Sequence, residues 1–153
     1  MQKIVPCLWF DENAEEAVNL YTSVFKNSSI DSMARYGEGG HGTPGKVMAI
    51  EFTLEGQHFM ALNGGPYYSF TPAISLMVNV ETQAELDDIW GKLSADPEEE
   101  QCGWLKDKFG LSWQVVPSVL GELMQDPDPE KVRRVNQVLL KMKKLNIAEL
   151  LSA

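Results

Sequence analysis

Six polar or aromatic side chains stand in short segments that are predicted β-strands, and in most of these segments apolar and polar residues alternate. In a β-strand, this alternation places successive side chains on opposite faces of the sheet. The Glu51 carboxylate can act as a general base, the Gln114 amide can hydrogen-bond a ligand, and the Trp104 indole can stack on a planar group. The candidates are Glu51 as catalytic residue and Trp9, Asn63, Ser75, Trp104 and Gln114 as ligand-binding residues.

The other chemistry-bearing residues favour no further class of active site. His58 stands alone at the start of a predicted strand, and His41 lies in a glycine-rich segment, so we expect both to be structural or solvated. Cys7 and Cys102 form no CxxC motif and no cluster with histidine, which opposes a structural zinc site. No GxSxG motif, dinucleotide-binding GxGxxG motif or phosphate-binding loop is present.

The net charge and the N-terminal sequence limit the classes of binding partner and the cellular location. The net charge of −9 opposes binding to nucleic acids, because an acidic surface repels a phosphate backbone. The N-terminal MQKIVPCLWFDE lacks the small-residue cleavage site of a signal peptide. No stretch approaches the ~18 apolar residues of a membrane span. We therefore expect a cytoplasmic protein with free thiols and no membrane contact.

The first half of the chain shows the periodicity of one strand, one helix and three further strands. In residues 46–54, Glu51 and Thr53 alternate with larger apolar side chains, which is typical of a strand with one buried face. Helical spacing of apolar residues predicts a helix over 14–25, with Asp11 and Asn13 as candidate caps. The predicted elements are residues 4–10, 14–25, 30–36, 46–54 and 57–63, with a glycine-rich loop at 37–45.

The same order recurs in the second half. Residues 13–21 and 82–90 overlay as helix starts at an offset of 69, and Thr82 with Glu85 forms a capping-box pattern. The repeat predicts an α+β fold of two paired βαβββ modules, which form a curved mixed sheet around a concave pocket. The predicted elements are a strand at 73–80, a helix at 81–93, a turn that can include a short strand at 96–101, and strands at 102–106 and 111–117.

A different pattern follows residue 117. Asp128 and Pro129 predict a helix start, and an apolar stripe continues the helix to about Asn146, before a last turn at 147–151. Residues 129–153 hold six of the 13 basic residues and two acids. This basic tail is either a solvated helix face or a clamp onto the acidic body of its own or a partner subunit. The stripe comprises Val132, Val135, Val138 or Leu139, and Met142.

We therefore expect one domain over residues 1–117, with modules at 1–66 and 67–117, and a C-terminal helical extension at 118–153. This length is enough to bury a hydrophobic core without disulfides or metals.

Several segments resemble one known family, the PhnB-like group of the glyoxalase/bleomycin-resistance (vicinal oxygen chelate) superfamily. Members of this group are often labelled 3-demethylubiquinone-9 3-methyltransferase. The resemblance implies paired βαβββ modules, a pocket on the concave face and a homodimer as the common assembly. It is carried by PCLWFDENAEEAVNLYTSVF (6–25), EFTLEGQHFMALNGGP (51–66), FTPAISLMVNVETQAELDDIW (70–90), CGWLKDKFGLSWQVVP (102–117) and DPDPEKVRRVNQVLLKMKKLNIAEL (126–150).

The resemblance also implies where a metal would bind. Metal-using relatives take ligands, typically His and Glu, from the first and last strands of each module. The corresponding positions here hold no His or carboxylate, and a divalent metal needs several good ligands in one place. We expect no tightly bound metal, although Gln114 with Glu51 would form a weak site. The positions are Gln114, Ser75, Asn63 or Met60, and Pro6 or Cys7.

Three functions fit these observations. The first is a small-molecule-binding protein in which Trp9 and Trp104 stack on the ligand. The second is an enzyme, an isomerase, lyase or group transferase, with Glu51 as general base. The third is an interaction module that uses the basic C-terminal helix. The parallel α/β sheet and glycine-rich loop that typically hold S-adenosylmethionine are not evident in the sequence.

Overall fold

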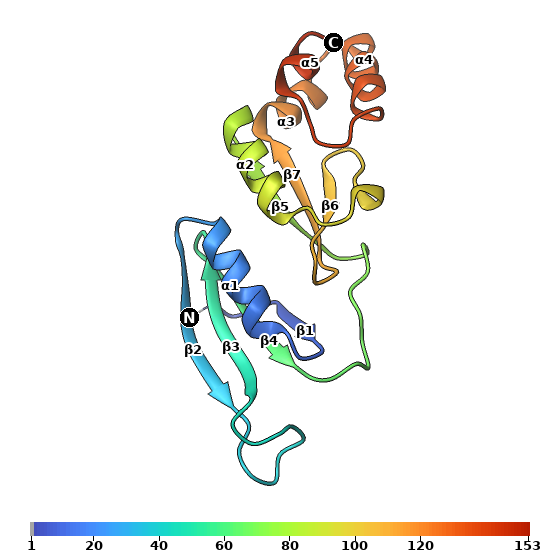
Figure 1. Ribbon diagram of the computed structural model, residues 1–153. Coiled ribbons are helices and arrows are strands. Elements are labelled where there is room, and N and C mark those ends of the chain that lie inside the picture. Colours follow the sequence, from blue (N-terminus) through green and yellow to red (C-terminus); the bar gives the residue numbers. More distant parts are fainter. Residues whose placement is uncertain (1) are drawn as a thin grey trace. The chain divides into compact units, whose positions relative to one another are not determined.

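The computed structural model describes residues 2–153, which fold into two compact units (Figure 1). Unit one ends at Phe70 and unit two comprises Thr71–Ala153. Both units combine helices with a mixed sheet, which confirms the predicted α+β class. Within residues 2–153, no helix has both the length and the apolar character that a membrane span requires.

Unit one has the predicted βαβββ order, and its four strands form one sheet in the order β1-β4-β3-β2. Strand β1 is parallel to β4, and the other neighbouring strands are antiparallel. Helix α1 packs on one face of this sheet, as Figure 1 shows. The elements are β1 (Cys7–Phe10), α1 (Ala14–Val24), β2 (Ser28–Arg35), β3 (Val47–Leu54) and β4 (Gln57–Asn63).

The core of unit one lies between α1 and β3. The helix buries five side chains at helical spacing, Tyr21 among them, and β3 buries Ile50 and Phe52 completely. The predicted alternation fails at the start of β3, where Val47 is buried and Met48 is exposed. The register with β2 shifts between Ala34 and Arg35, and such a shift turns the local side chains to the other face.

The start of α1 differs from the sequence expectation. Asn13 occupies the N-cap position, but its side chain makes no capping hydrogen bond. Instead, Asn63 Oδ1 accepts a hydrogen bond from the backbone N of Ala14 at 2.9 Å. Because this amide comes from the end of β4, the contact ties the helix start to the sheet and satisfies an N–H that the helix itself leaves unpaired.

Unit two has a three-stranded sheet in the order β5-β7-β6, with β5 parallel to β7. Thr82 Oγ accepts a hydrogen bond from the Glu85 backbone N at 3.2 Å, which confirms the predicted cap of α2. The elements are β5 (Ser75–Val80), α2 (Gln83–Leu93), the 3₁₀ helix η1 (Pro97–Glu99), β6 (Trp104–Lys106), β7 (Ser112–Pro117), α3 (Ser118–Met124), α4 (Pro129–Leu139) and α5 (Ile147–Leu151).

The acidic segment before β6 forms no fourth strand in the described part of unit two. It folds into η1, and only Gln101 bridges back to Trp104. Pro97 lacks the N–H that a strand ladder needs, and Asp96 caps the 3₁₀ turn by accepting from the backbone N of Glu98. The second module is therefore a shorter version of the first.

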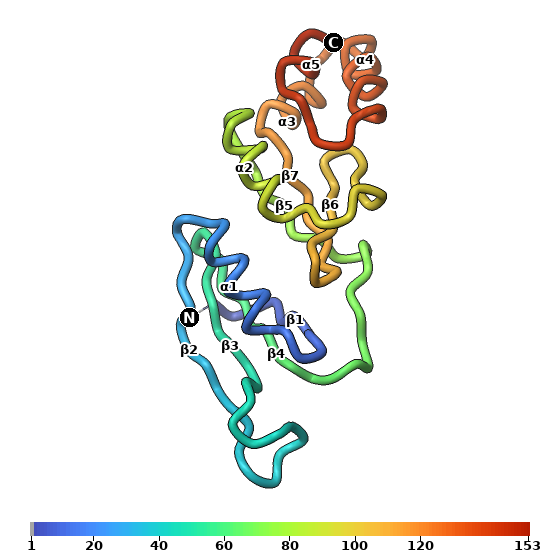
Figure 2. The backbone as a smooth tube through the Cα atoms, viewed as in Figure 1, coloured from blue at the N-terminus to red at the C-terminus, as the bar shows by residue number. Residues whose placement is uncertain are grey.

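The C-terminal helices belong to unit two. Asp128 caps α4, with Pro129 at the first helical position as predicted. The helix ends at Leu139 and not near Asn146. The residues after it bind the turn before β6 instead: the carbonyls of Met142 and Lys143 accept hydrogen bonds from the backbone N of Cys102 and Gly103 at 2.9 and 2.8 Å. Figure 2 shows this segment beside the turn before β6.

The basic tail contacts the body of its own unit. Lys144 pairs with Asp87 of α2 at 2.9 Å, and Lys143 Nζ donates to the Pro97 carbonyl at 2.7 Å. Leu145, between these contacts and α5, is completely buried. These contacts match the predicted alternative in which the tail binds the acidic body of its own chain. Other basic residues of the tail, such as Arg134, are exposed.

Candidate functional site

The registers of unit one define a sheet face opposite α1, here called the open face of unit one. Trp9 pairs with Leu62 of β4, and Cys7 pairs with Met60. Met60 is in turn opposite Glu51 of β3. Directly paired residues share a face, so this face comprises Cys7, Trp9, Ser29, Ser32, Ala34, Ala49, Glu51, Thr53, His58, Met60 and Leu62.

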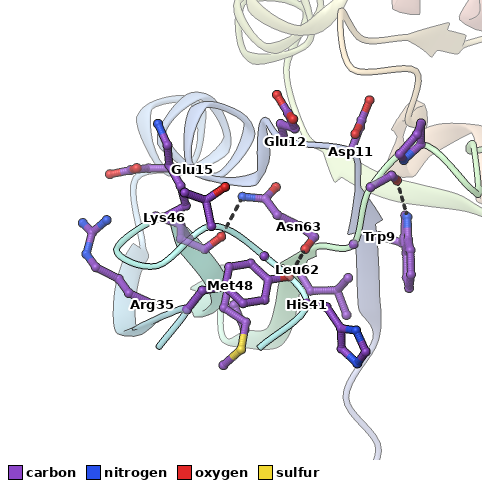
Figure 3. A pocket seen from close by; sticks show the side chains of 18 of the residues that line it. Trp9, Asp11, Glu12, Glu15, Arg35, His41, Lys46, Met48, Leu62 and Asn63 are labelled. Carbon is purple, nitrogen blue, oxygen red and sulfur yellow. Dashed lines mark hydrogen bonds between the residues drawn. The ribbon is translucent and has the colours of Figure 1, made fainter. Parts of the chain in front are cut away.

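Trp9 is held in a fixed orientation on this face. Its Nε1 donates to the Gly65 carbonyl at 2.9 Å, and its ring meets Tyr68 edge-on with centroids 5.0 Å apart. The indole lies so close to Gly64 that a Cβ there would come within 2.2 Å of it. Figure 3 shows Trp9 at one side of a hollow, with the hydrogen bond drawn.

Glu51 and Asn63, which the sequence assigns to one site, lie on different faces of the sheet. Glu51 is exposed, and its Oε2 accepts from Ser32 Oγ at 3.1 Å. Asn63 pairs with the buried Phe10, and its Nδ2 donates to the Val47 carbonyl at 3.1 Å. Together with its bond to Ala14, this makes Asn63 a positioning residue of the fold (Figure 3). The predicted ligand-binding role of Asn63 stays a prediction.

A broad hollow of about 1250 Å³ lies at the end of this sheet (Figure 3). Residues 41–45 of the glycine-rich segment form one wall, and the Tyr36 hydroxyl, at the start of this segment, donates to the Asn63 carbonyl at 2.6 Å. Sequence periodicity does not foresee this hollow, because its walls come from loops; the glycine-rich composition is the one signal for it. Its rim carries side chains of both charges: Asp11, Glu12, Glu15, Arg35 and Lys46.

The three candidates in unit two lie together on one face of its sheet. Gln114 Nε2 donates to Ser75 Oγ at 2.9 Å, and Trp104 stands directly opposite Gln114 in the β6–β7 register. All three side chains are half-buried. The registers confirm the predicted alternation, and this open face of unit two comprises Ser75, Met77, Asn79, Trp104, Lys106, Ser112, Gln114 and Val116.

The side chains at the implied metal positions do not fit a divalent ion. In unit one the register places Cys7 and Met60 on the open face, in preference to Pro6 and Asn63. In unit two the implied positions are Ser75 and Gln114. Burial raises the pKa of the Cys7 thiol, which disfavours the thiolate that ligates metals. Residues 2–153 contain no cluster of three or more His, Cys, Asp or Glu side chains that could hold a metal.

Comparison with known proteins gives the family. A family model described as 3-demethylubiquinone-9 3-methyltransferase matches residues 2–116. The chain belongs to this family. The match ends just before α3, so α3–α5 lie outside the matched residues. No curated protein matches the chain.

One solved structure supports this placement, and a second shares the fold. A putative 3-demethylubiquinone-9 3-methyltransferase, the PhnB protein of Bacillus cereus, is 42% identical with a TM-score of 0.67; the match covers 76% of this chain and 100% of that one. Protein PA1353 of Pseudomonas aeruginosa is 22% identical with a TM-score of 0.60, over 76% of this chain and 98% of its own; this likeness shows the fold alone. The PhnB-like resemblance and the glyoxalase-like fold are thereby confirmed.

Proposed function

We propose that this protein of the 3-demethylubiquinone-9 3-methyltransferase family binds a small molecule on the open face of unit two, without a tightly bound metal. The observation that carries the proposal is the hydrogen bond from Gln114 to Ser75 beside the half-buried indole of Trp104. Polar groups that are preorganised beside an aromatic surface are the usual elements of a ligand site.

The free groups on this face indicate the class of ligand. Because Gln114 donates one amide hydrogen to Ser75, its Oε1 can accept and its second N–H can donate. The Ser75 hydroxyl proton is free to donate as well, since its oxygen is the acceptor in this contact. Together with the Trp104 indole, these groups suit a planar ring that bears oxygen substituents. The quinone named in the family description is a ring of this kind.

The proposal extends to the metal, the assembly and the location. We infer a metal-free site because the side chains at the implied ligand positions are a thiol, a thioether, a hydroxyl and an amide, which form a poor set for a divalent ion. The proposal also includes a cytoplasmic homodimer and a ligand-stacking role for Trp9 on the open face of unit one, considered by itself.

A ligand screen tests the proposal. Thermal shifts are measured with a panel of small phenols and quinones on the wild-type protein and on the variants Trp104→Ala and Gln114→Leu. We expect each variant to lose the shifts of the wild-type hits, whereas the control Gln137→Leu, at an exposed position of α4, keeps them. Hits that persist in both site variants would overturn the proposal.

The enzyme alternative rests on Glu51, whose exposed carboxylate shares the open face of unit one with Trp9. A general base must come within hydrogen-bond reach of the substrate proton, and an exposed carboxylate leaves room for a substrate to approach. If a hit from the screen is chemically converted, Glu51→Gln should abolish the conversion and leave the thermal shift intact. Conversion that survives Glu51→Gln would remove Glu51 from this role.

A further inference from the structure

Lys106 places a positive charge on the open face of unit two. It lies on β6, two residues along from Trp104, and stands opposite Ser112 of β7. Its side chain is half-buried, and it forms no ion pair, hydrogen bond or ring contact with any residue in the range 2–153. Because lysines that are withdrawn from water are usually paired, this ammonium group has an interaction to gain from a ligand.

The other basic residues of unit two are exposed or paired. Lys131 is the other half-buried one, and its Nζ lies 3.0 Å from Asp126 Oδ2. The remaining lysines and arginines of Thr71–Ala153 are exposed. Lys106 is therefore the basic residue of unit two whose side chain is both partly withdrawn from water and without a partner in the described chain.

The surroundings of Lys106 on this face carry no opposite charge. No Asp or Glu is among the residues that the β5–β7 and β6–β7 registers place there. Asp107, the next residue of the chain, is 3% exposed and accepts hydrogen bonds from two backbone N–H groups and the Trp113 indole. The chain as a whole is acidic, but this face is locally positive.

The strand order makes Lys106 a neighbour of the proposed ligand-binding groups (Figure 1). Trp104 is directly opposite Gln114, and Lys106 is diagonal to Gln114, at roughly 7–8 Å between Cα atoms. Ser75 and Lys106 are both opposite Ser112 on the central strand, so two strand spacings, roughly 9–10 Å, separate them. The flexible four-carbon stem of Lys106 can bring its Nζ to the edge of a ring of this size.

We propose that Lys106 selects an anionic ligand for the open face of unit two, so that the preferred small molecule is a planar ring with a carboxylate substituent. The ring stacks on Trp104, the Gln114 amide hydrogen-bonds an oxygen substituent, and the Lys106 ammonium pairs with the carboxylate. The inference rests on the proposed function, because it names the charge of the ligand at the same site.

A purely structural role for Lys106 makes a different prediction. Lysine can cover apolar surface with its methylene stem and leave its ammonium in water. Lys106→Met keeps an unbranched apolar stem and removes the charge, whereas Lys106→Arg keeps the charge. If the stem alone matters, Lys106→Met binds every ligand as the wild-type protein does.

Isothermal titration calorimetry near neutral pH compares para-hydroxybenzoate, whose carboxyl group is then ionised, with the neutral para-hydroxybenzamide. In the wild-type protein we expect the benzoate to bind roughly tenfold more tightly, because it gains a charge-assisted hydrogen bond. Lys106→Met should lose this preference and keep its affinity for the benzamide, which also shows that the variant is folded. Lys106→Arg should keep the preference, as should the control Lys141→Met, which removes the same charge at an exposed position.

The outcomes separate this inference from the proposed function. Equal affinities for the two probes in the wild-type protein, or a preference that survives Lys106→Met, would overturn the inference and leave the proposed function standing. Affinities for both probes that do not change in Trp104→Ala would overturn the proposed function, and the inference with it. If neither probe binds, the inference is wrong, and the thermal-shift screen with phenols and quinones decides the proposed function separately.

Discussion

Gln114 on the central strand of unit two donates a 2.9 Å hydrogen bond to Ser75 on the neighbouring parallel strand. The two residues are not register partners: Gln114 is opposite Met77, and Ser75 is opposite Ser112. The amide therefore reaches diagonally along the open face, which orients it next to Trp104 and away from the covered face. A fixed amide loses less side-chain entropy on binding than a mobile one.

The contact between Trp9 and Gly64 predicts a specific effect of one added methyl group. A Cβ at Gly64 would lie 2.2–2.5 Å from the indole, so Gly64→Ala should displace Trp9 and reduce the free energy of unfolding by about 1–3 kcal/mol. Denaturant unfolding followed by tryptophan fluorescence measures both effects.

The matched control for this prediction is Gly91→Ala. Gly91 lies inside α2, and a Cβ there meets no other atom within 4 Å, so the substitution should raise the free energy of unfolding by about 0.5–1 kcal/mol. If Gly64→Ala behaves like Gly91→Ala, the close contact between Gly64 and the indole is wrong.

Asp107 is a buried carboxylate that organises the turn between β6 and β7. Its Oδ1 accepts from the backbone N of Phe109 and Leu111, and its Oδ2 accepts from Trp113 Nε1 at 2.9 Å. Asp107→Ala leaves these donors without their acceptor and should cost roughly 2–4 kcal/mol in the free energy of unfolding.

The control for Asp107 is Asp88→Ala, which removes an exposed ion pair with Lys92 on α2 and should cost less than about 1 kcal/mol. Chemical denaturation monitored by circular dichroism compares the two variants. Equal costs would show that the buried acceptor role of Asp107 is not important for stability.

The C-terminal extension should be part of the folded core of unit two. Leu145 is fully buried and lies 3.2 Å from the position of a Cβ at Gly103, so Leu145→Ala should cost about 2–5 kcal/mol. Leu151→Ala, at a 55% exposed position of α5, should change stability by less than about 0.5 kcal/mol.

Truncation after Pro117 tests the extension as a whole. Since the carbonyls of Met142 and Lys143 satisfy backbone N–H groups before β6, we expect the truncated chain to lose cooperative unfolding. A truncated protein that keeps the stability of the full chain would instead favour the tail as a device for binding a partner.

The ion pair between Asp87 and Lys144 predicts a pH dependence. The pKa of Asp87 lies below its ordinary value because of hydrogen bonds from Gln83 and then Lys144. A lowered carboxyl pKa in the folded state stabilises the fold above the unfolded pKa, and this contribution is lost as the pH falls through the folded pKa. Carbon-13 titration of the carboxyl group should show Asp87 rising in pKa in Lys144→Gln, and rising more in Gln83→Leu. An ordinary pKa in the wild-type protein would contradict this arrangement.

The features that the sequence predicts correctly are those encoded by local patterns. Alternation along residues 111–117 predicts that Gln114 lies on the other face of the strand from the buried Trp113 and Val115, as the structure shows. Local patterns also predict the helix caps at Thr82 and Asp128. Both depend on residues within a few positions of one another, where period and side-chain type are sufficient.

The features that the sequence does not predict depend on distant contacts. Asn63 caps a helix 49 residues earlier in the chain, and α4 ends at Leu139 because the segment after it satisfies backbone N–H groups at Cys102 and Gly103. The shift in the β2–β3 register between Ile30 and Ser32 has no periodic signal either. Candidate sites built on alternation alone therefore find the open face of unit two and miss contacts between distant segments.

The position of a bound ligand is the most direct test of the proposed function. Nuclear magnetic resonance of the protein, titrated with a phenol or quinone from the thermal-shift screen, reports on the Gln114 side-chain amide and the Trp104 indole N–H. We predict that both resonances shift saturably, and that Gln114→Leu weakens binding by roughly tenfold. Saturable shifts confined to residues outside the open face of unit two, with unchanged affinity in Gln114→Leu, would contradict the central claim.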